Sequence, residues 1–179
     1  MDLRVKKTRT SIINAFIQLR SKKPLEKITV KELAELAMIN KATFYLHYKD
    51  IYDLSDSLEE ELIQNVLNNI TDADNFSEQL INGLIAQGEL FTILLSDTRN
   101  NNFANKLEKE IKKFIFNNSP QYANDKKIDI ALSYAIQGSY HAFINNNNTY
   151  DTTSIVNILN FINKLITQIN FNEILELKI

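Results

Sequence analysis

Residues 28–50, ITVKELAELAMINKATFYLHYKD, predict two short helices joined by a tight turn. Thr29 lies three residues before Glu32, which is the spacing of a capping box, so we expect a helix that begins at Thr29 and ends near Ala37. Asn40 is placed to cap a second helix of about eight residues. Helices this short are not stable in isolation. They must pack on each other and on a neighbouring helix, which is the helix-turn-helix arrangement.

The rest of the chain has the pattern of an all-α protein. Its 179 residues include only 3 glycines and 2 prolines, and apolar residues recur at three- and four-residue spacing over long spans. An apolar content of 44% is enough to form a sizeable core. We expect about nine helices. The segments with helical periodicity are 3–21, 29–37, 41–48, 51–70, 76–95, 101–117, 126–145 and 153–176.

The same periodicity predicts which residues of each helix are buried. In the first segment the expected inner residues are Ile12, Ile13, Phe16, Ile17 and Leu19, and the basic residues around them are Lys6, Lys7, Arg9 and Arg20. In the second helix the expected buried stripe is Leu33, Leu36 and Ala37. Three consecutive acidic residues, Glu59, Glu60 and Glu61, face three directions around a helix, which indicates a solvated surface rather than a carboxylate site.

Charge is divided unevenly along the chain. Residues 1–50 hold 11 Lys or Arg against 5 Asp or Glu, and the remainder holds 9 against 17. The first part could neutralise phosphates and the second would repel them, although a solvated basic face gives the same count. With no cysteine, neither a disulfide nor a Cys-ligated metal can form. No signal peptide or membrane span is expected, so the predicted location is the cytoplasm.

The second helix of a helix-turn-helix presents its first residues to base edges in the DNA major groove. Those positions are Lys41, Ala42 and Thr43, of which lysine can donate to guanine and threonine offers a hydroxyl and a methyl group. Tyr45, His47 and Lys49 are expected to reach phosphate oxygens. Phe44 and Tyr48 are four residues apart and share a face, so we expect them to pack against the first helix.

The stretch ITVKELAELAMINKATFYLHYKDIYDL resembles the DNA-binding signature of TetR-family transcriptional regulators, over roughly residues 8–54. The resemblance implies a helix-turn-helix DNA-binding domain at 1–49 and a helical dimerisation and effector-binding domain at 50–179. It also implies that Thr29 and Lys31 lie near phosphates, and that the Asn40 cap, Lys41, Thr43, Tyr45, His47 and Lys49 belong to the DNA-binding surface.

One position departs from the family pattern. The family commonly has glycine in the turn, where this chain has Met38. A left-handed conformation at a non-glycine residue costs about 1 kcal/mol, which favours another turn geometry here.

The last two predicted helices carry more apolar residues than one edge of a small helical domain can usually bury. A homodimer with a four-helix interface explains this, and a stripe inside a monomer is the alternative. The candidate dimerisation residues are Ile136, Tyr140, Phe143, Ile155, Leu159, Ile162 and Ile166. Two recognition helices related by a two-fold axis would read a pseudo-palindrome in double-stranded DNA.

A small-molecule effector is expected from the family resemblance. Candidate pocket residues are Phe91, Tyr134, Gln137 and His141, with core or interface packing as the alternative. The segments FTILLSDTRNNNFANKLEKEIKKFI and YAIQGSYHAFINNNNTYDTTSIVNILNFI are weakly similar to regulators and co-activators of dihydroxyacetone kinase operons. That similarity implies the alternative of a protein partner in place of a small ligand.

Nothing in the sequence indicates an enzyme. It has no glycine-rich phosphate loop, no HExxH and no GxSxG, and we expect no cofactor. The two histidines, His47 and His141, lie on distant helices, so no metal site is expected. The resemblance therefore implies a homodimeric transcription factor, most often a repressor in this family, that leaves its operator when a small molecule binds. A DNA-binding protein that decorates many sites without regulation is a further alternative.

Overall fold

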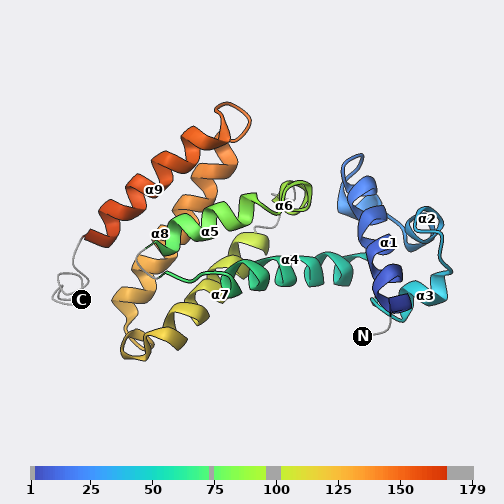
Figure 1. Cartoon of the computed structure of the whole chain (residues 1–179), viewed down its shortest axis with the longest axis horizontal. Coiled ribbons are helices and arrows are strands. Elements are labelled where there is room, and N and C mark those ends of the chain that lie inside the picture. Colours follow the sequence, from blue (N-terminus) through green and yellow to red (C-terminus); the bar gives the residue numbers. More distant parts are fainter. Residues whose placement is uncertain (1–2, 73–74, 96–101, 169–179) are drawn as a thin grey trace. The chain divides into compact units, whose positions relative to one another are not determined.

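The structure is a computed structural model that describes residues 3–72, 75–95 and 102–168. Within these residues the chain forms nine α-helices and no strand, which confirms the predicted all-α fold (Figure 1). The helices are α1 (Leu3–Arg20), α2 (Val30–Leu36), α3 (Lys41–Tyr45), α4 (Ile51–Asn68), α5 (Phe76–Ile85), α6 (Glu89–Leu95), α7 (Asn102–Asn118), α8 (Lys126–Asn146) and α9 (Thr152–Gln168). Two short 3-10 turns, η1 (Leu25–Lys27) and η2 (Pro120–Tyr122), lie between them.

The chain forms two compact units. The first consists of Met1–Leu62 and Gln87–Asn100, and the second of Ile63–Ala86 and Asn101–Ile179. The first unit therefore continues past the domain boundary expected at residue 49, because it includes the first turns of α4 and the whole of α6. None of the helices in the described ranges is both long and apolar enough to cross a membrane.

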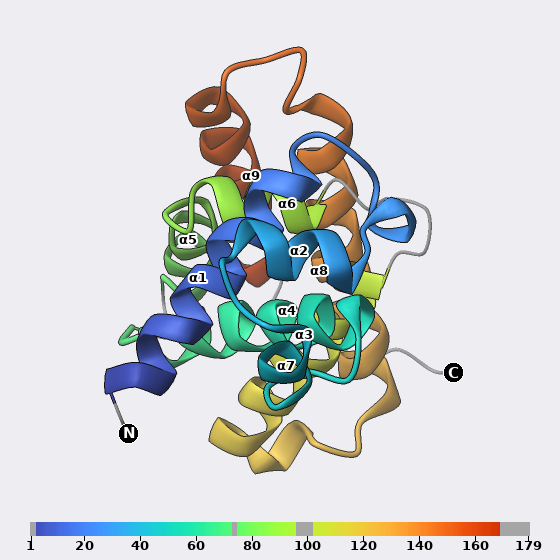
Figure 2. The same ribbon diagram turned by 90° about the vertical axis from the view of Figure 1, so that its right-hand side faces the viewer.

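The first unit is built around α1, which packs against α2 and α6, while α2 packs against α3 (Figure 2). Its core is apolar and includes Ile12, Phe16, Leu33, Phe44, Leu54 and Phe91. Leu36, which was expected to be buried, is 42% exposed. The buried stripe of α2 is instead Leu33, Ala34 and Ala37, a spacing that turns Leu36 toward solvent.

Two charged residues expected at the surface are buried in the first unit. Arg20 lies at the end of α1, where its guanidinium donates to the backbone carbonyls of Lys23 and Ile93, each at 3.3 Å. These bonds compensate for the water that the charge has lost. Glu59 is also buried, so the acidic run of α4 is not uniformly solvated.

The turn between α2 and α3 is closed by Met38, whose φ of 53° is left-handed. The N–H of Met38 donates to the carbonyl of Glu35 at 3.2 Å, and that of Ile39 donates to the carbonyl of Ala34 at 2.9 Å. This pair of bonds is a Schellman motif, which satisfies carbonyls left open at the end of α2. The expectation of another turn geometry is therefore wrong: the two hydrogen bonds offset the strain at Met38.

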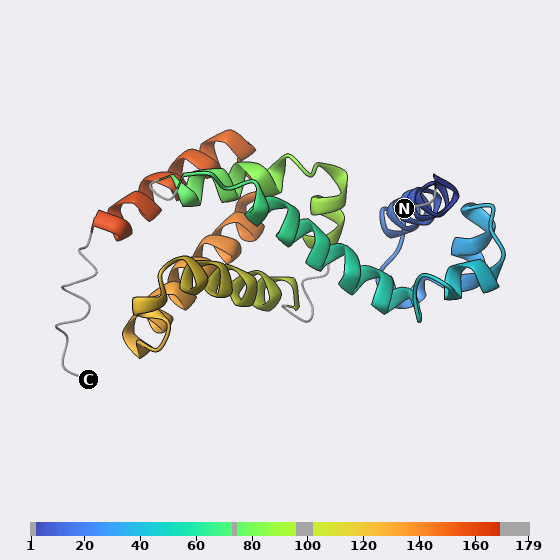
Figure 3. The same ribbon diagram turned by 60° about the horizontal axis from the view of Figure 1, so that its bottom comes forward.

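Four helices dominate the second unit: α7 packs against α8, and α9 packs against both α8 and α5 (Figure 3). Its core includes Val66, Leu84, Leu107, Ile111, Ile128, Ile155 and Leu159. A Cβ at Gly83 of α5 would lie 2.8 Å from Val66 Cγ1, so glycine permits the close approach of α5 to the end of α4. The single segment expected over 76–95 is broken into α5 and α6 at Gly88, which has a φ of 61°.

Candidate nucleic-acid interface

Helix α3 is fixed at its start and along its inner side. Asn40 caps it, since Asn40 Oδ1 accepts a hydrogen bond from the backbone N–H of Ala42 at 2.9 Å. Phe44 and Tyr48 are both buried in the first unit, as the sequence predicts, and their ring centroids are 5.8 Å apart. The helix ends at Tyr45, earlier than expected, and the backbone continues as a turn in which Tyr48 N–H donates to the Phe44 carbonyl at 3.0 Å.

The opposite side of α3 faces solvent. Lys41, Ala42 and Tyr45 are exposed, and Thr43 and His47 are half-buried. These five residues are among the nine that the sequence assigns to DNA binding, the others being Thr29, Lys31, Asn40 and Lys49. Leu46, which was not assigned a role, is 84% exposed and belongs to the same surface. The outer side of α3 is therefore accessible to a partner, while its inner side is packed against the first unit.

Helix α2 starts at a capped end. Thr29 Oγ1 accepts a hydrogen bond from the backbone N–H of Glu32 at 3.3 Å, which is half of the predicted capping box. The carboxylate of Glu32 instead pairs with Lys23, so the return bond of the box is replaced by an ion pair. Thr29 and Lys31 are exposed, as a role beside phosphates requires.

The backbone of Lys49 is held at the entrance to α4. Its N–H donates to Asp53 Oδ2 at 2.9 Å, and the N–H of Asp53 donates to Asp50 Oδ1 at 2.8 Å. Asp50 therefore serves as the predicted cap of α4. Lys49 itself is exposed, which leaves its ammonium group at the surface just after α3.

An ion pair joins α1 to α4 behind this surface. The guanidinium of Arg9 pairs with the carboxylate of Glu61 and lies beside the hydroxyl of Tyr48. Burial raises the pKa of Tyr48, and the neighbouring guanidinium acts in the opposite sense. Arg9 is thus committed to a contact inside the first unit, although the sequence placed it among the outer basic residues of the helix.

An open groove of about 590 Å³ runs between the first turns of α1 and the turn after α2. Helix α1 lines it with Leu3, Arg4, Lys7, Thr8 and Ser11, and the turn lines it with Ala37, Met38 and Ile39. None of these residues has a function predicted from the sequence. The signal was present in the spacing of residues 4, 7, 8 and 11, which places basic and hydroxyl side chains on one face of a helix.

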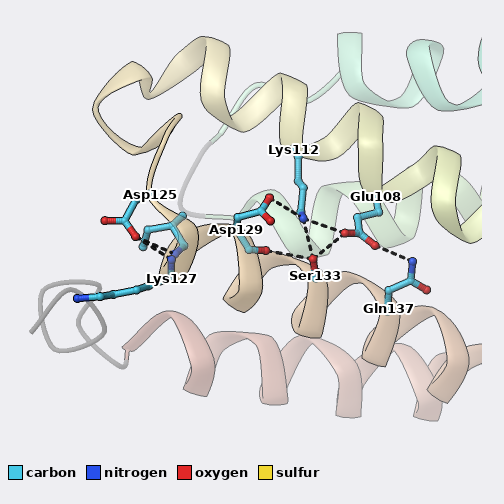
Figure 4. Close-up of polar contacts among 8 residues, drawn as sticks. Glu108, Lys112, Asp125, Lys127, Asp129, Ser133 and Gln137 are labelled. Atoms are coloured by element: carbon cyan, nitrogen blue, oxygen red, sulfur yellow. Dashed lines mark hydrogen bonds and ion pairs between the residues drawn. The ribbon is translucent and has the colours of Figure 1, made fainter. Parts of the chain in front are cut away.

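The four effector candidates do not come together within one unit. Phe91 is buried in the first unit, and the other three lie on α8 in the second. Tyr134 is 74% exposed, and His141 contacts the ring of Tyr140 edge-on at 5.2 Å. Gln137 is part of a polar cluster between α7 and α8, where its Nε2 donates to Glu108 Oε2 at 2.7 Å (Figure 4). Tyr134 is therefore placed for a surface contact rather than for a pocket.

The dimerisation candidates divide into buried and exposed residues. Ile155 and Leu159 belong to the core of the second unit. The rings of Tyr140 and Phe103 pack together, with centroids 6.2 Å apart. These three residues therefore lie inside the unit and not at the dimer interface expected for them. Ile136 and Phe143 are half-buried, and the side chain of Ile166 lies outside the described residues. Ile162 is exposed, in a stripe along α9 that comprises Ile158, Phe161, Ile162 and Leu165. At 100° per residue, the exposed stripe is centred about 90° around α9 from Ile155 and Leu159, so the apolar surface of α9 is wider than the side that its own unit buries.

Among the residues that the structure describes, no group of three or more His, Cys, Asp or Glu is close enough to hold an ion. The half-buried carboxylate of Glu108 is instead neutralised by Lys112, whose Nζ lies 2.8 Å from Glu108 Oε1.

Comparisons with known proteins define what the fold resembles. No model of a protein family matches the chain, and the comparison with curated proteins also finds no match. Among solved structures, the chain is similar to the fatty acid degradation regulator FadR from Bacillus halodurans, with a TM-score of 0.59 and 16% sequence identity. The similarity covers 91% of this chain and 96% of that one. At this identity the two proteins share an all-α fold over nearly their whole lengths.

Proposed function

We propose that this protein is a sequence-specific DNA-binding transcription regulator of the TetR type. The observation that carries the proposal is the construction of α3, which the Asn40 cap and the buried Phe44 and Tyr48 hold rigidly while Lys41 and Ala42 face solvent. A short helix presented in this way is the element that enters the DNA major groove in helix-turn-helix proteins.

The charge of the chain supports the same function. The excess of basic residues is confined to residues 1–50, which contain the helix-turn-helix, and the remainder is acidic. Three exposed lysines lie along this segment: Lys31 at the start of α2, Lys41 at the start of α3 and Lys49 four residues after α3. Phosphate contacts of this kind position a protein on DNA and provide most of its non-specific affinity.

The similar fold of the regulator FadR supports a regulatory role as well. That protein is described as a regulator of fatty acid degradation, and its fold matches this chain over both units. The proposed mechanism is repression, with release of the operator when a small molecule binds more tightly to the form that does not fit DNA. Fatty acids are a reasonable first class for an effector screen.

The proposed regulator acts as a homodimer. Ile158, Phe161, Ile162 and Leu165 form an exposed apolar stripe on α9, and Ile130 and Tyr134 are exposed on α8. An exposed stripe of this kind marks an association surface. Pairing α8 and α9 with a second copy would make a four-helix interface and supply two recognition helices for a pseudo-palindromic site.

The test is fluorescence anisotropy with the purified protein and two labelled duplexes. One duplex carries the DNA immediately upstream of the gene that encodes this protein, and the other is a scrambled sequence of equal composition. The expected result is a preference for the upstream duplex of at least about a thousandfold, with two subunits bound per duplex. If the operator is not upstream of this gene, selection of bound sites from a random DNA library identifies the preferred sequence. Equal affinity for every sequence in both assays would contradict a sequence-specific regulator.

A further inference from the structure

The groove between α1 and the turn after α2 has two chemically different walls. Arg4, Lys7, Thr8 and Ser11 supply cations and hydroxyl groups from α1. Met38 and Ile39 supply apolar surface from the turn, and Met38 is 92% exposed. A sugar–phosphate backbone matches both walls, because its phosphate oxygens accept hydrogen bonds and its deoxyribose carbons are apolar.

The position of the groove relates it to the recognition helix. Met38 and Ile39 directly precede Asn40, so one wall of the groove leads into the first turn of α3. The major groove of DNA is only about 12 Å wide and is bordered by two phosphate strands. If α3 enters the major groove of DNA, one of the two DNA strands that border that major groove passes close to Met38 and Ile39.

We propose that this groove is a second DNA-backbone site, in which Arg4 and Lys7 bind a phosphate outside the helix-turn-helix itself. The proposal rests on the DNA-binding function proposed above. Its occupant is one strand of the same duplex that α3 reads. Met38 packs against the sugar of that strand, while Thr8 and Ser11 donate hydrogen bonds to the phosphate that Lys7 neutralises.

Two of the basic residues near the start of α1 line the groove and two do not. Arg4, Lys6, Lys7 and Arg9 lie within two turns of each other. Arg9 is paired with Glu61, and Lys6 does not line the groove, being about 100° around the helix from Lys7. Lys6 and Lys7 are both exposed and carry the same charge, so they form a matched pair for a test.

The experiment measures the affinity of the full-length variants Lys7→Gln and Lys6→Gln for a random-sequence duplex about three helical turns long, over a series of salt concentrations. A random duplex is suitable because phosphate contacts do not depend on base sequence. Lys7→Gln should lower the slope of log affinity against log salt by about one per subunit that contacts DNA. Lys6→Gln should leave that slope within error of the wild type. Equal slopes for the two variants would overturn the proposal.

A second variant tests the site without removing a lysine. Ser11→Glu places a carboxylate in the groove, and Thr10→Glu places one on an exposed neighbouring position outside it. Binding to the same duplex should fall about tenfold more for Ser11→Glu than for Thr10→Glu. Circular dichroism melting confirms that each variant is folded. Failure of the wild type to bind any duplex contradicts the proposed function, whereas wild-type binding that both Glu variants reduce equally contradicts only this second site.

Discussion

The ammonium group of Lys112 on α7 lies 2.7 Å from Asp129 Oδ1 on α8 (Figure 4). The same ammonium is 2.8 Å from Glu108 Oε1 and donates to Ser133 Oγ at 2.6 Å. Only 15% of the Lys112 side chain and 20% of that of Glu108 are exposed, so this pair is shielded from water, whereas Asp129 is 53% exposed. The cluster therefore fixes the register of α7 against α8 within the second unit.

Lys112→Met should destabilise the protein by about 2 kcal/mol, between the values for exposed and fully buried ion pairs. Methionine keeps the volume of the side chain but leaves Glu108 and Asp129 without their shared cation. The matched control is Lys113→Met on the next position of α7, where the side chain is 64% exposed and lies 3.5 Å from Glu110. Urea unfolding followed by circular dichroism gives both values, and an equal effect of the two changes would contradict a shielded cluster.

Stability should also fall in acid because of Glu108. The hydrogen bond from Lys112, with those from Ser133 and Gln137, lowers the pKa of Glu108 from 4.5 to about 2. Because the folded pKa lies below the unfolded one, the contribution is complete above pH 4.5 and is lost as the pH falls toward 2. The difference in urea midpoint between the wild type and Glu108→Gln should shrink over that range. A difference that stays constant from pH 7 to pH 2.5 would rule out this linkage.

Local signals in the sequence account for most of the helix ends. The caps at Thr29, Asn40 and Asp50 depend on side chains and backbone groups only two or three residues apart, so their pattern is readable without a fold. The burial of Phe44 and Tyr48 was also predictable, since one face of a very short helix must carry its packing.

Choices between two similar faces could not be made from the sequence. Helix α9 carries one wide apolar surface, and only the packing against α5 and α8 shows that Ile155 and Leu159 are internal while Phe161 is exposed. The burial of Arg20 depends on the Ile93 carbonyl, 73 positions away in sequence. The groove on α1 likewise needs the turn at Met38 beside it, which periodicity alone cannot place.

Met38→Gly should stabilise the protein by about 1 kcal/mol, because glycine adopts the left-handed conformation of the turn without steric cost. The control is Met38→Ala, which also removes the exposed side chain but keeps the Cβ that causes the strain. Met38→Ala should leave the free energy of unfolding nearly unchanged. Equal unfolding free energies for the two variants would show that the left-handed backbone is not the source of any strain.

Ile162→Glu should convert dimers to monomers, since it places a charge in the middle of the apolar stripe on α9. Thr153→Glu adds the same charge on an exposed polar side of the helix and should leave the dimer intact. Sedimentation equilibrium should show a dissociation constant at least about a hundredfold higher for Ile162→Glu. A wild-type protein that is monomeric at every concentration tested would leave the stripe to a different partner and contradict the homodimer.

Thr43→Ala and Lys49→Ala should separate base reading from phosphate binding. Thr43 lies in the first turn of α3, so loss of its hydroxyl and methyl group should weaken the preferred site by about 1 kcal/mol while non-specific affinity stays unchanged. Lys49 lies beyond α3 with its backbone fixed by Asp53, so its loss should weaken binding to every duplex and lower the salt slope by about one. Anisotropy with the selected site and a scrambled duplex, each over a salt series, measures both quantities for both variants. If Thr43→Ala weakens both duplexes equally, Thr43 positions the helix rather than reading a base, and the specificity of α3 must come from Lys41 and its exposed neighbours.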